Sequence, residues 1–377
     1  QKNSWPGREG MSIKNNLYLL LLFAVVGGCK AQNMEEKFDW SATISAPKEY
    51  PVEVYQGEVA GKSYGQNLSH LGPIAVGWGL SGATVSSGPD TKELPDYVGL
   101  TWVSFTDRKA YSGQFQLPKE KILKLFKEGF SNGATKKKET YNSFIVGLAP
   151  KGNIIVWVAG GGNQVEIGQF TGVETKMDTT KLSDEEKHMF THKYVDYVLS
   201  DTMIVEPQFQ AKIKSQAHAK PELYTSIYRE KYNWVPKVVL PAGYHLTNWS
   251  FMLCNGEKEY ILSGDHIVSK ESRAIPYLLN VMFTDDEKNR YETDIVISRD
   301  KNYLPNLQQN GLATYIPVDF DVNETNKIFR EQLNKTLPTE LLINIHPKNK
   351  TLNLDLIQGT LNIPIEQIEF QIKNYGN

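Results

Sequence analysis

A weak internal repeat constrains the fold of this 377-residue chain more than any other feature. Trp40 and Trp234 each open the pattern W-x₆-P-x₂-Y. Three further pairs of similar segments follow in the same order: 94–102 with 275–283, 120–128 with 324–331, and 144–158 with 341–356. One such match arises by chance, but four in the same order indicate two copies of one module.

The hydrophobic pattern predicts the elements of each module. Residues 99–105 and 110–116 alternate apolar and polar side chains, which predicts two strands around a turn. Residues 144–148 and 153–158 predict a second hairpin, and Pro118 begins a helix with one apolar face. We therefore expect an α+β fold of two similar modules, each an antiparallel sheet covered by one helix.

A helical segment is expected to join the two modules. Ser183 and Glu186 form a capping box, and Pro221 begins another helix. The predicted domain organisation is a first module at 38–180, a helical connector at 181–232 and a second module at 233–377.

The front of the chain carries the pattern of a secretion signal. Residues 1–10 precede the first methionine and have no apolar periodicity, and Lys14 supplies a positive charge before the apolar run 17–26. Ten helical residues cover about 15 Å, half of a hydrocarbon core, so the run is predicted to be a signal-peptide core and not a membrane span.

The four residues Val26, Gly27, Gly28 and Cys29 resemble a bacterial lipobox. The resemblance implies cleavage before Cys29, whose thiol receives diacylglycerol, so that 1–28 is removed and 29–37 forms a tether. Acyl chains contribute about 0.8 kcal/mol per buried CH₂, which would hold the mature protein on a membrane. Lys30 stands where inner-membrane retention signals place aspartate, which favours the outer membrane of a bacterial cell envelope.

Composition excludes several classes of protein. A net charge of −2 and a pI near 6.5 argue against a nucleic-acid binder, and two cysteines cannot form a disulfide scaffold. Cys254 is expected to be a small buried apolar residue. We expect no nucleic-acid partner, no cofactor and no metal.

Several motifs imitate catalytic or metal sites but lack a required part. Residues 79–83 (G-L-S-G-A) resemble a nucleophile elbow without the helix that must follow, and 160–162 (G-G-G) is expected to be a hairpin turn. His188 and His192 share a helix face, but Met189 replaces the glutamate of the zinc-protease pattern. Asp319, Asp321 and Asn323 imitate a calcium loop, yet Glu324 and Arg330 break the pattern and indicate a helix cap.

Two features suggest a binding surface. Lys119, Lys121, Lys124 and Lys127, with 136–138, form a basic patch that would attract anionic lipid, the alternative being an ordinary solvated helix face. Trp78, Trp102, Trp157 and Trp249 are expected in the sheet core, with a binding surface as the alternative. The candidate surface residues are Lys121, Lys124, Lys127 and Trp78.

Three segments are similar to a bacterial lipoprotein family called domain of unknown function 2931. They read L-P-D-Y-V-G-L-T-W-V-S, Y-S-G-Q-F-Q-L-P-K-E-K-I and V-G-L-A-P-K-G-N-I-I-V-W-V, and 255–257 and 273–276 keep looser similarity. The family carries no catalytic assignment. Some members are encoded beside lipase effectors of type VI secretion, which implies an immunity role for a tethered protein that binds the toxin.

Two functional hypotheses follow. The first is a non-catalytic envelope lipoprotein that binds a protein partner, such as a secreted phospholipase toxin, because no residue set combines a nucleophile, a base and an orienting group. The alternative is an envelope hydrolase or small-ligand carrier that uses a cleft between the modules.

Overall fold

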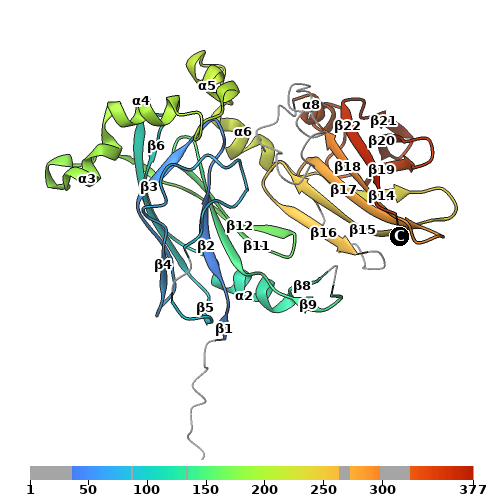
Figure 1. Cartoon of the computed structure of the whole chain (residues 1–377), viewed down its shortest axis with the longest axis horizontal. Coiled ribbons are helices and arrows are strands. Elements are labelled where there is room, and N and C mark those ends of the chain that lie inside the picture. The colour runs from blue at the N-terminus through green and yellow to red at the C-terminus, as the bar shows by residue number, and fades with distance from the viewer. Residues whose placement is uncertain (1–35, 86–87, 133–134, 263–271, 298–322, 377) are drawn as a thin grey trace, which may run out of the picture. The chain divides into compact units, whose positions relative to one another are not determined.

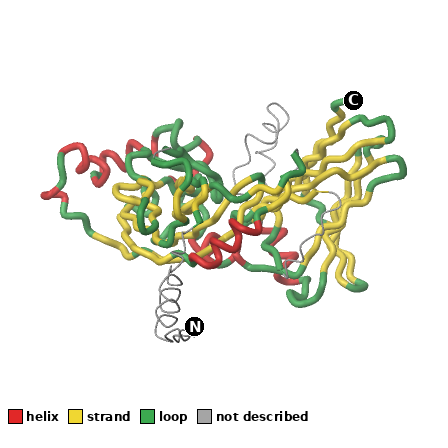
Figure 2. Tube along the Cα trace, turned by 90° about the horizontal axis from the view of Figure 1, so that it is seen from below, coloured by secondary structure: helices red, strands yellow, loops and turns green. Residues whose placement is uncertain are grey.

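Strands make up most of the regular structure, and the helices are short (Figures 1 and 2). The computed structural model describes residues 36–85, 88–132, 135–262, 272–297 and 323–376. Within it, residues 37–377 cluster as one compact unit. The α+β class predicted from the sequence is confirmed.

The hairpin of β10 (Ser143–Ala149) and β11 (Asn153–Gly160) is buried on both faces. Ile145 and Trp157 belong to one hydrophobic cluster, whereas their neighbours Phe144 and Val158 belong to another. A strand covered on both faces has apolar residues at nearly every position, which explains this part of the sequence. Gly147 is needed here because a Cβ would collide with the ring of Trp157.

The first half of the chain forms strands in two sheets. β2 (Ser41–Ser45) lies parallel to β10, and the order continues through β11 to β12 (Asn163–Thr171). An antiparallel sheet has the order β13-β7-β6-β3-β4, with bounds Val173–Thr175, Lys109–Gln116, Tyr97–Ser104, Val52–Ala60 and Gly65–Asn67. The predicted strands at 99–105 and 110–116 are β6 and β7, and the predicted hairpin is β10–β11.

The second half has strands in the same relative order. β14 lies parallel to β19, and β20 and β21 follow; their bounds are Trp234–Val239, Thr339–His346, Thr351–Gln358 and Leu361–Pro364. The order β22-β18-β17-β15-β16 is antiparallel, with bounds Ile368–Asn374, Arg290–Ile297, Pro276–Asp285, Tyr244–Leu253 and Lys258–Leu262.

One residue pair, Gln164 with Lys258, joins β12 to β16 and so creates a nine-stranded sheet, β2-β10-β11-β12-β16-β15-β17-β18-β22. The expectation of one antiparallel sheet in each half is therefore wrong. Each half has strands in two sheets, and β2·β10 and β14·β19 are parallel pairs. Long connections allow parallel pairing, and local alternation in the sequence does not specify a strand's partner.

Within the described residues, a helix follows the strand hairpin of each half: α2 (Lys119–Glu128) and α8 (Asn323–Glu331). Pro118 stands directly before α2, which buries Ile122 and Phe126. Two short ladders lie in the same half as α2: β1 (Lys37–Phe38) with β5 (Lys92–Glu93), and β8 (Phe130–Ser131) with β9 (Lys138–Glu139).

Short helices form the segment between the halves, with bounds η2 Thr179–Lys181, α3 Asp184–Lys187, η3 His188–Phe190, α4 His192–Ser200, α5 Pro207–Lys214, α6 Pro221–Thr225 and η4 Ile227–Arg229. The capping box of Ser183 and Glu186 is present, and Pro221 is the first residue of α6. The helix expected after Ser183 is interrupted at Thr191, because its hydroxyl accepts from the Tyr194 N–H and starts α4 anew.

A buried tryptophan under a buried cation occurs at the matching place in both halves. Trp40 donates its indole N–H to the Glu93 carbonyl (2.9 Å), and the Lys92 ammonium lies 5.1 Å from the ring centre. Trp234 donates to the Ala274 carbonyl (3.1 Å), and the Arg273 guanidinium lies 5.6 Å from its ring. Each tryptophan thus ties the start of a parallel strand to the segment before the central antiparallel strand.

The junction between the halves is filled by side chains. Trp157 donates to the Asn255 carbonyl (3.1 Å), and the Gln164 amide donates to the carbonyls of Gly79 (2.9 Å) and Gly256 (2.6 Å). Trp157, Gln164 and Asn255 are at most 1% exposed. Buried polar groups that are this well bonded fix the two halves in one arrangement.

Replacing Arg273 should destabilise the fold strongly. Its Nε lies 3.2 and 3.1 Å from the two carboxylate oxygens of Glu259, and its Nη1 donates to the Trp234 carbonyl. Arg273→Ala should lower the unfolding free energy by about 3–5 kcal/mol, because the carboxylate of Glu259 remains buried without its cation. Arg273→Met with Glu259→Leu should recover most of that loss in urea denaturation.

Lys92→Ala is the matched control, since Lys92 donates to the Pro89 carbonyl (3.3 Å) and forms no recorded ion pair with a described residue. It should cost about 1–2 kcal/mol. Equal losses for Arg273→Ala and Lys92→Ala would contradict this account.

Candidate functional site

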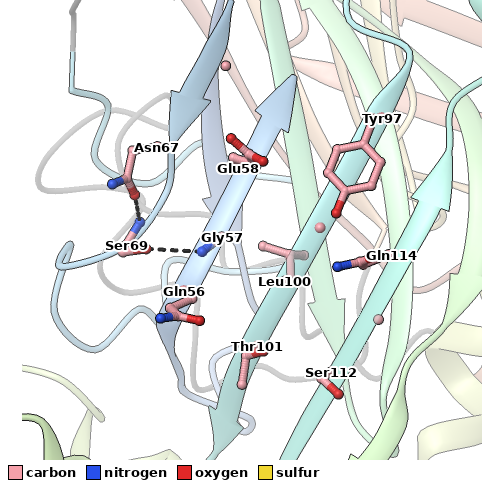
Figure 3. A pocket seen from close by; sticks show the side chains of 13 residues that line it. Gln56, Gly57, Glu58, Asn67, Ser69, Tyr97, Leu100, Thr101, Ser112 and Gln114 are labelled. Atoms are coloured by element: carbon pink, nitrogen blue, oxygen red, sulfur yellow. Dashed lines mark hydrogen bonds between the residues drawn. The ribbon is translucent and has the colours of Figure 1, made fainter. Parts of the chain in front are cut away.

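The outer face of the sheet β13-β7-β6-β3-β4 is covered at one end only. Val98, Leu100 and Trp102 of β6 point into the core, so alternate residues point outward. At the covered end, Val103 packs in a small cluster with Val195 and Val198 of α4. The remaining outer face of β3, β6 and β7 is hollowed (Figure 3).

Gly99 lies at the centre of this hollow. It pairs with Glu58 of β3 on one side and with Gln114 of β7 on the other, while Tyr97 and Thr101 flank it along β6. Four neighbours with side chains surround one residue without a side chain, which produces a depression of about 600 Å³. Glycine inside a strand is typical of places where another chain or ligand approaches the backbone.

Tyr97 closes part of this depression. A Cβ at Gly99 would collide with the Tyr97 hydroxyl, so the ring lies over the glycine. Burial, followed by the Glu58 carboxylate, raises the pKa of Tyr97, so its hydroxyl keeps its proton and remains a hydrogen-bond donor at neutral pH.

The side chains that line the hollow are mainly amides and hydroxyls, namely Gln56, Asn67, Ser69, Thr101, Ser112 and Gln114, with Glu58 as the one carboxylate. Ser69 accepts from the Gly57 N–H (3.0 Å), and Asn67 accepts from the Ser69 N–H (2.6 Å), so the edge beside β4 is internally bonded. Neutral amides and hydroxyls suit binding through hydrogen bonds. A single carboxylate adds a preference for a cationic or hydroxyl-bearing group.

A second hollow, of about 430 Å³, lies on the matching strands of the other half. The strand register is shifted between Val54 and Gln56 in β3, and between Leu246 and Asn248 in β15. The second hollow has a more apolar lining, including Met282, Phe283 and Tyr291. The same backbone geometry therefore carries two chemically different surfaces.

The predicted surface residues do not lie together in this site. Lys121, Lys124 and Lys127 are exposed on α2 and do not line either hollow. Trp78 is 0% exposed, and its ring lies 5.0 Å from that of Trp157. The assignment of Trp78 to a binding surface is therefore wrong, because it packs from a loop onto the central hairpin.

The lipobox residues Val26, Gly27, Gly28 and Cys29 lie outside the described residues. In the described part of the chain, no helix is long and apolar enough to cross a membrane.

The other sequence motifs are described where the structure covers them. Residues 79–83 are followed by loop, and Gly161 and Gly162 form the β11–β12 turn with positive φ (53° and 85°). His188 and His192 lie in separate helices, and no group of three or more metal-binding side chains occurs in the described residues. Asp319 and Asp321 lie outside those residues.

Cys254 is 3% exposed, and burial raises the pKa of its thiol well above the ordinary range. A thiol that stays protonated is a poor nucleophile. This agrees with the expectation of a buried apolar residue.

The hollow was not expected from the sequence, although a signal was present. Gly57, Gly99 and Gly113 interrupt three adjacent strands at or next to its floor. A glycine inside a strand is typical of a bulge or of a place where another chain or a ligand approaches the backbone, so glycines in three adjacent strands indicate such a place. Their alignment became visible only with the strand register.

A family model described as protein of unknown function (DUF2931) matches residues 29–221. The similar segments 255–257 and 273–276 lie outside this match. No match was found among curated proteins or among solved structures.

Glu53, at the boundary between the covered and open parts of the sheet, should make the free energy of unfolding depend on pH. Glu53 is 6% exposed and accepts from the Tyr194 hydroxyl of α4 (2.8 Å). Burial raises its pKa above the ordinary 4.5, and the Tyr194 hydrogen bond, His188 and His70 partly offset this rise. Between 4.5 and the raised pKa of Glu53, the native state therefore binds more protons than the unfolded state. The free energy of unfolding should fall as pH rises through this range.

Glu53→Gln removes the buried charge and keeps an acceptor for Tyr194. It should raise the free energy of unfolding at neutral pH by on the order of 1 kcal/mol. The gain should shrink below pH 4.5, which urea denaturation across pH measures. The control Glu58→Gln, on the same strand but exposed, should show no such trend; an identical trend would contradict the explanation.

Proposed function

This chain belongs to the DUF2931 family of proteins of unknown function, and we propose that it is a lipid-anchored envelope protein that binds a protein partner. The observation that carries the proposal is the open polar hollow centred on Gly99. It lies on a broad sheet face, its lining donates and accepts hydrogen bonds, and its floor lets a partner approach the backbone.

The lipid anchor at Cys29 has two supports. The family match begins at residue 29, the cysteine of the lipobox pattern. The first described strand, β1, begins at Lys37, the last residue of the predicted tether 29–37. Lys30 favours the outer membrane of the bacterial envelope as the location.

Duplication of one module is also part of this proposal. It is supported by the matching strand orders, the parallel pairs β2·β10 and β14·β19, and the register shifts in β3 and β15. The tryptophan–cation contacts of Trp40 and Trp234 support it further. Unrelated halves would have no reason to share a shift and a buried contact at matching places.

The proposed partner is a secreted phospholipase toxin, which makes the protein an immunity protein. The support is the resemblance to lipoproteins encoded beside type VI lipase effectors. An anchored binder would meet such a toxin at the membrane where its substrate lies.

The alternative, a hydrolase or ligand carrier with a cleft between the halves, has less support. The described junction is filled by the buried side chains of Trp157, Gln164 and Asn255. Trp157 donates to the Asn255 carbonyl, and Gln164 donates to the Gly256 carbonyl. A substrate there would have to displace buried, bonded groups.

The binding proposal is tested by substitutions that fill the hollow or reverse its one negative charge. Thr101→Trp and Glu58→Lys should each weaken binding to the product of a neighbouring effector gene by at least about tenfold, measured by calorimetry. The matched controls are Thr351→Trp and Glu366→Lys, exposed positions in the second half.

Affinity that is unchanged in the hollow variants would exclude the hollow as the binding surface. If no complex forms and cells producing the protein are not protected from the effector, the immunity proposal is wrong.

The anchor makes a separate prediction about thiols. In the acylated protein Cys29 is blocked and Cys254 is buried, so Ellman's reagent should detect no thiol in the native state and one after denaturation. The Cys254→Ser variant serves as the control and should show none in either state. A reactive thiol in the native wild-type protein would contradict acylation of Cys29.

A further inference from the structure

We propose that the exposed face of α2, together with Lys136–Lys138, contacts anionic phospholipid in the membrane that holds the anchor. This inference rests on the proposed acylation of Cys29. The six lysines Lys121, Lys124, Lys127, Lys136, Lys137 and Lys138 are here called the basic face, and all are exposed.

The chain enters the fold beside α2. Strand β1 lies near α2 (Figure 1). Phe38 of β1 packs edge-on against Phe126 of α2, with ring centres 5.3 Å apart. The nine residues 29–37 span at most about 30 Å when fully extended. Since α2 has ten residues and is about 15 Å long, an anchor at Cys29 allows the helix to reach the lipid surface.

The lysines of α2 point away from the core. Ile122 and Phe126 are the buried residues of the helix. At 100° per residue, Lys121, Lys124 and Lys127 fall within about 60° of the direction opposite this pair. Lys121 remains exposed although its Nζ donates to the Glu166 carbonyl of β12 (2.9 Å), so the charged side of α2 faces out of the protein.

Acidic residues reduce this charge without cancelling it. Glu120, Glu128 and Glu139 are the exposed acids in α2 and β9, against six lysines. Lys124 lies 3.7 Å from Glu128, but these side chains are 72% and 61% exposed, so the pair is weak and screened. The basic face keeps a net positive charge on a chain whose overall charge is −2.

Helix α8 keeps an exposed lysine, Lys327, at the position of Lys124 but differs from α2 at the other two positions. Where α2 has Lys127, α8 has Arg330, whose Nε lies 3.3 Å from Glu230. At the position of Lys121, α8 has Glu324. The basic face thus belongs to the half that carries the tether, as a membrane contact requires.

Each lysine near an anionic surface contributes up to about 1 kcal/mol. With the acyl chains providing attachment, this energy orients the body with α2 toward the lipid.

The test uses the full acylated protein in vesicles of phosphatidylcholine, with or without phosphatidylglycerol. Lysines are acetylated with a membrane-impermeant reagent and quantified by mass spectrometry. Phosphatidylglycerol should slow acetylation of the basic face about threefold and leave Lys348 and Lys350, exposed in the second half, unchanged. Added salt should remove the difference.

The triple variant Lys121→Glu/Lys124→Glu/Lys127→Glu keeps the buried side of α2 and should lose the protection of Lys136–Lys138. Lys348→Glu/Lys350→Glu is the matched control and should keep it. If mass spectrometry shows that Cys29 is acylated but the basic face is acetylated equally in both vesicle types, the proposed orientation is wrong and the anchor is not affected. An unmodified Cys29 instead overturns the anchor in the proposed function, and the orientation with it.

Discussion

The β10–β11 hairpin is buried on both faces, and both halves of the chain are built against it. A shift of one residue in its pairing would exchange the side chains of the two faces. Trp157 would then enter the cluster that now holds Val156 and Val158, which has no space for an indole at interior packing density. The register of this hairpin therefore determines where Trp78 packs and where the second half attaches through Asn255.

Both halves place a buried cation over a buried tryptophan, but the cation and its hydrogen-bond acceptor differ. In the first half a lysine lies over Trp40 with a backbone carbonyl as acceptor, and in the second an arginine lies over Trp234 with a buried carboxylate. The guanidinium is planar and bonds to two groups at once, which suits the more enclosed position. The outer faces also differ in chemistry, since amides surround Gly99 whereas aromatic rings line the second hollow.

Local features of the sequence predicted local structure well. Pro118 and the Ser183–Glu186 box mark helix starts because their effect acts within one turn. The parallel partner of β2 and the single bridge at Gln164 could not be predicted, because a strand's own pattern does not identify its neighbour. The buried position expected for Trp78 is confirmed, and its alternative assignment to a binding surface is wrong. A tryptophan in a loop has the same sequence signature whether it is exposed or buried. The hollow at Gly99 depends on cross-strand register, which only the folded chain defines.

The contact between β12 and β16 has a consequence for solubility. An uncovered strand edge presents free N–H and C=O groups that can pair with another molecule and start aggregation. Here the edges of β12 and β16 face each other and share one paired position. Next to it, the Glu166 N–H donates to the Glu257 carboxylate, and the Tyr260 N–H donates to the Asn163 side chain. Closing these two edges against each other thus removes a site of unwanted self-association from each half of the chain.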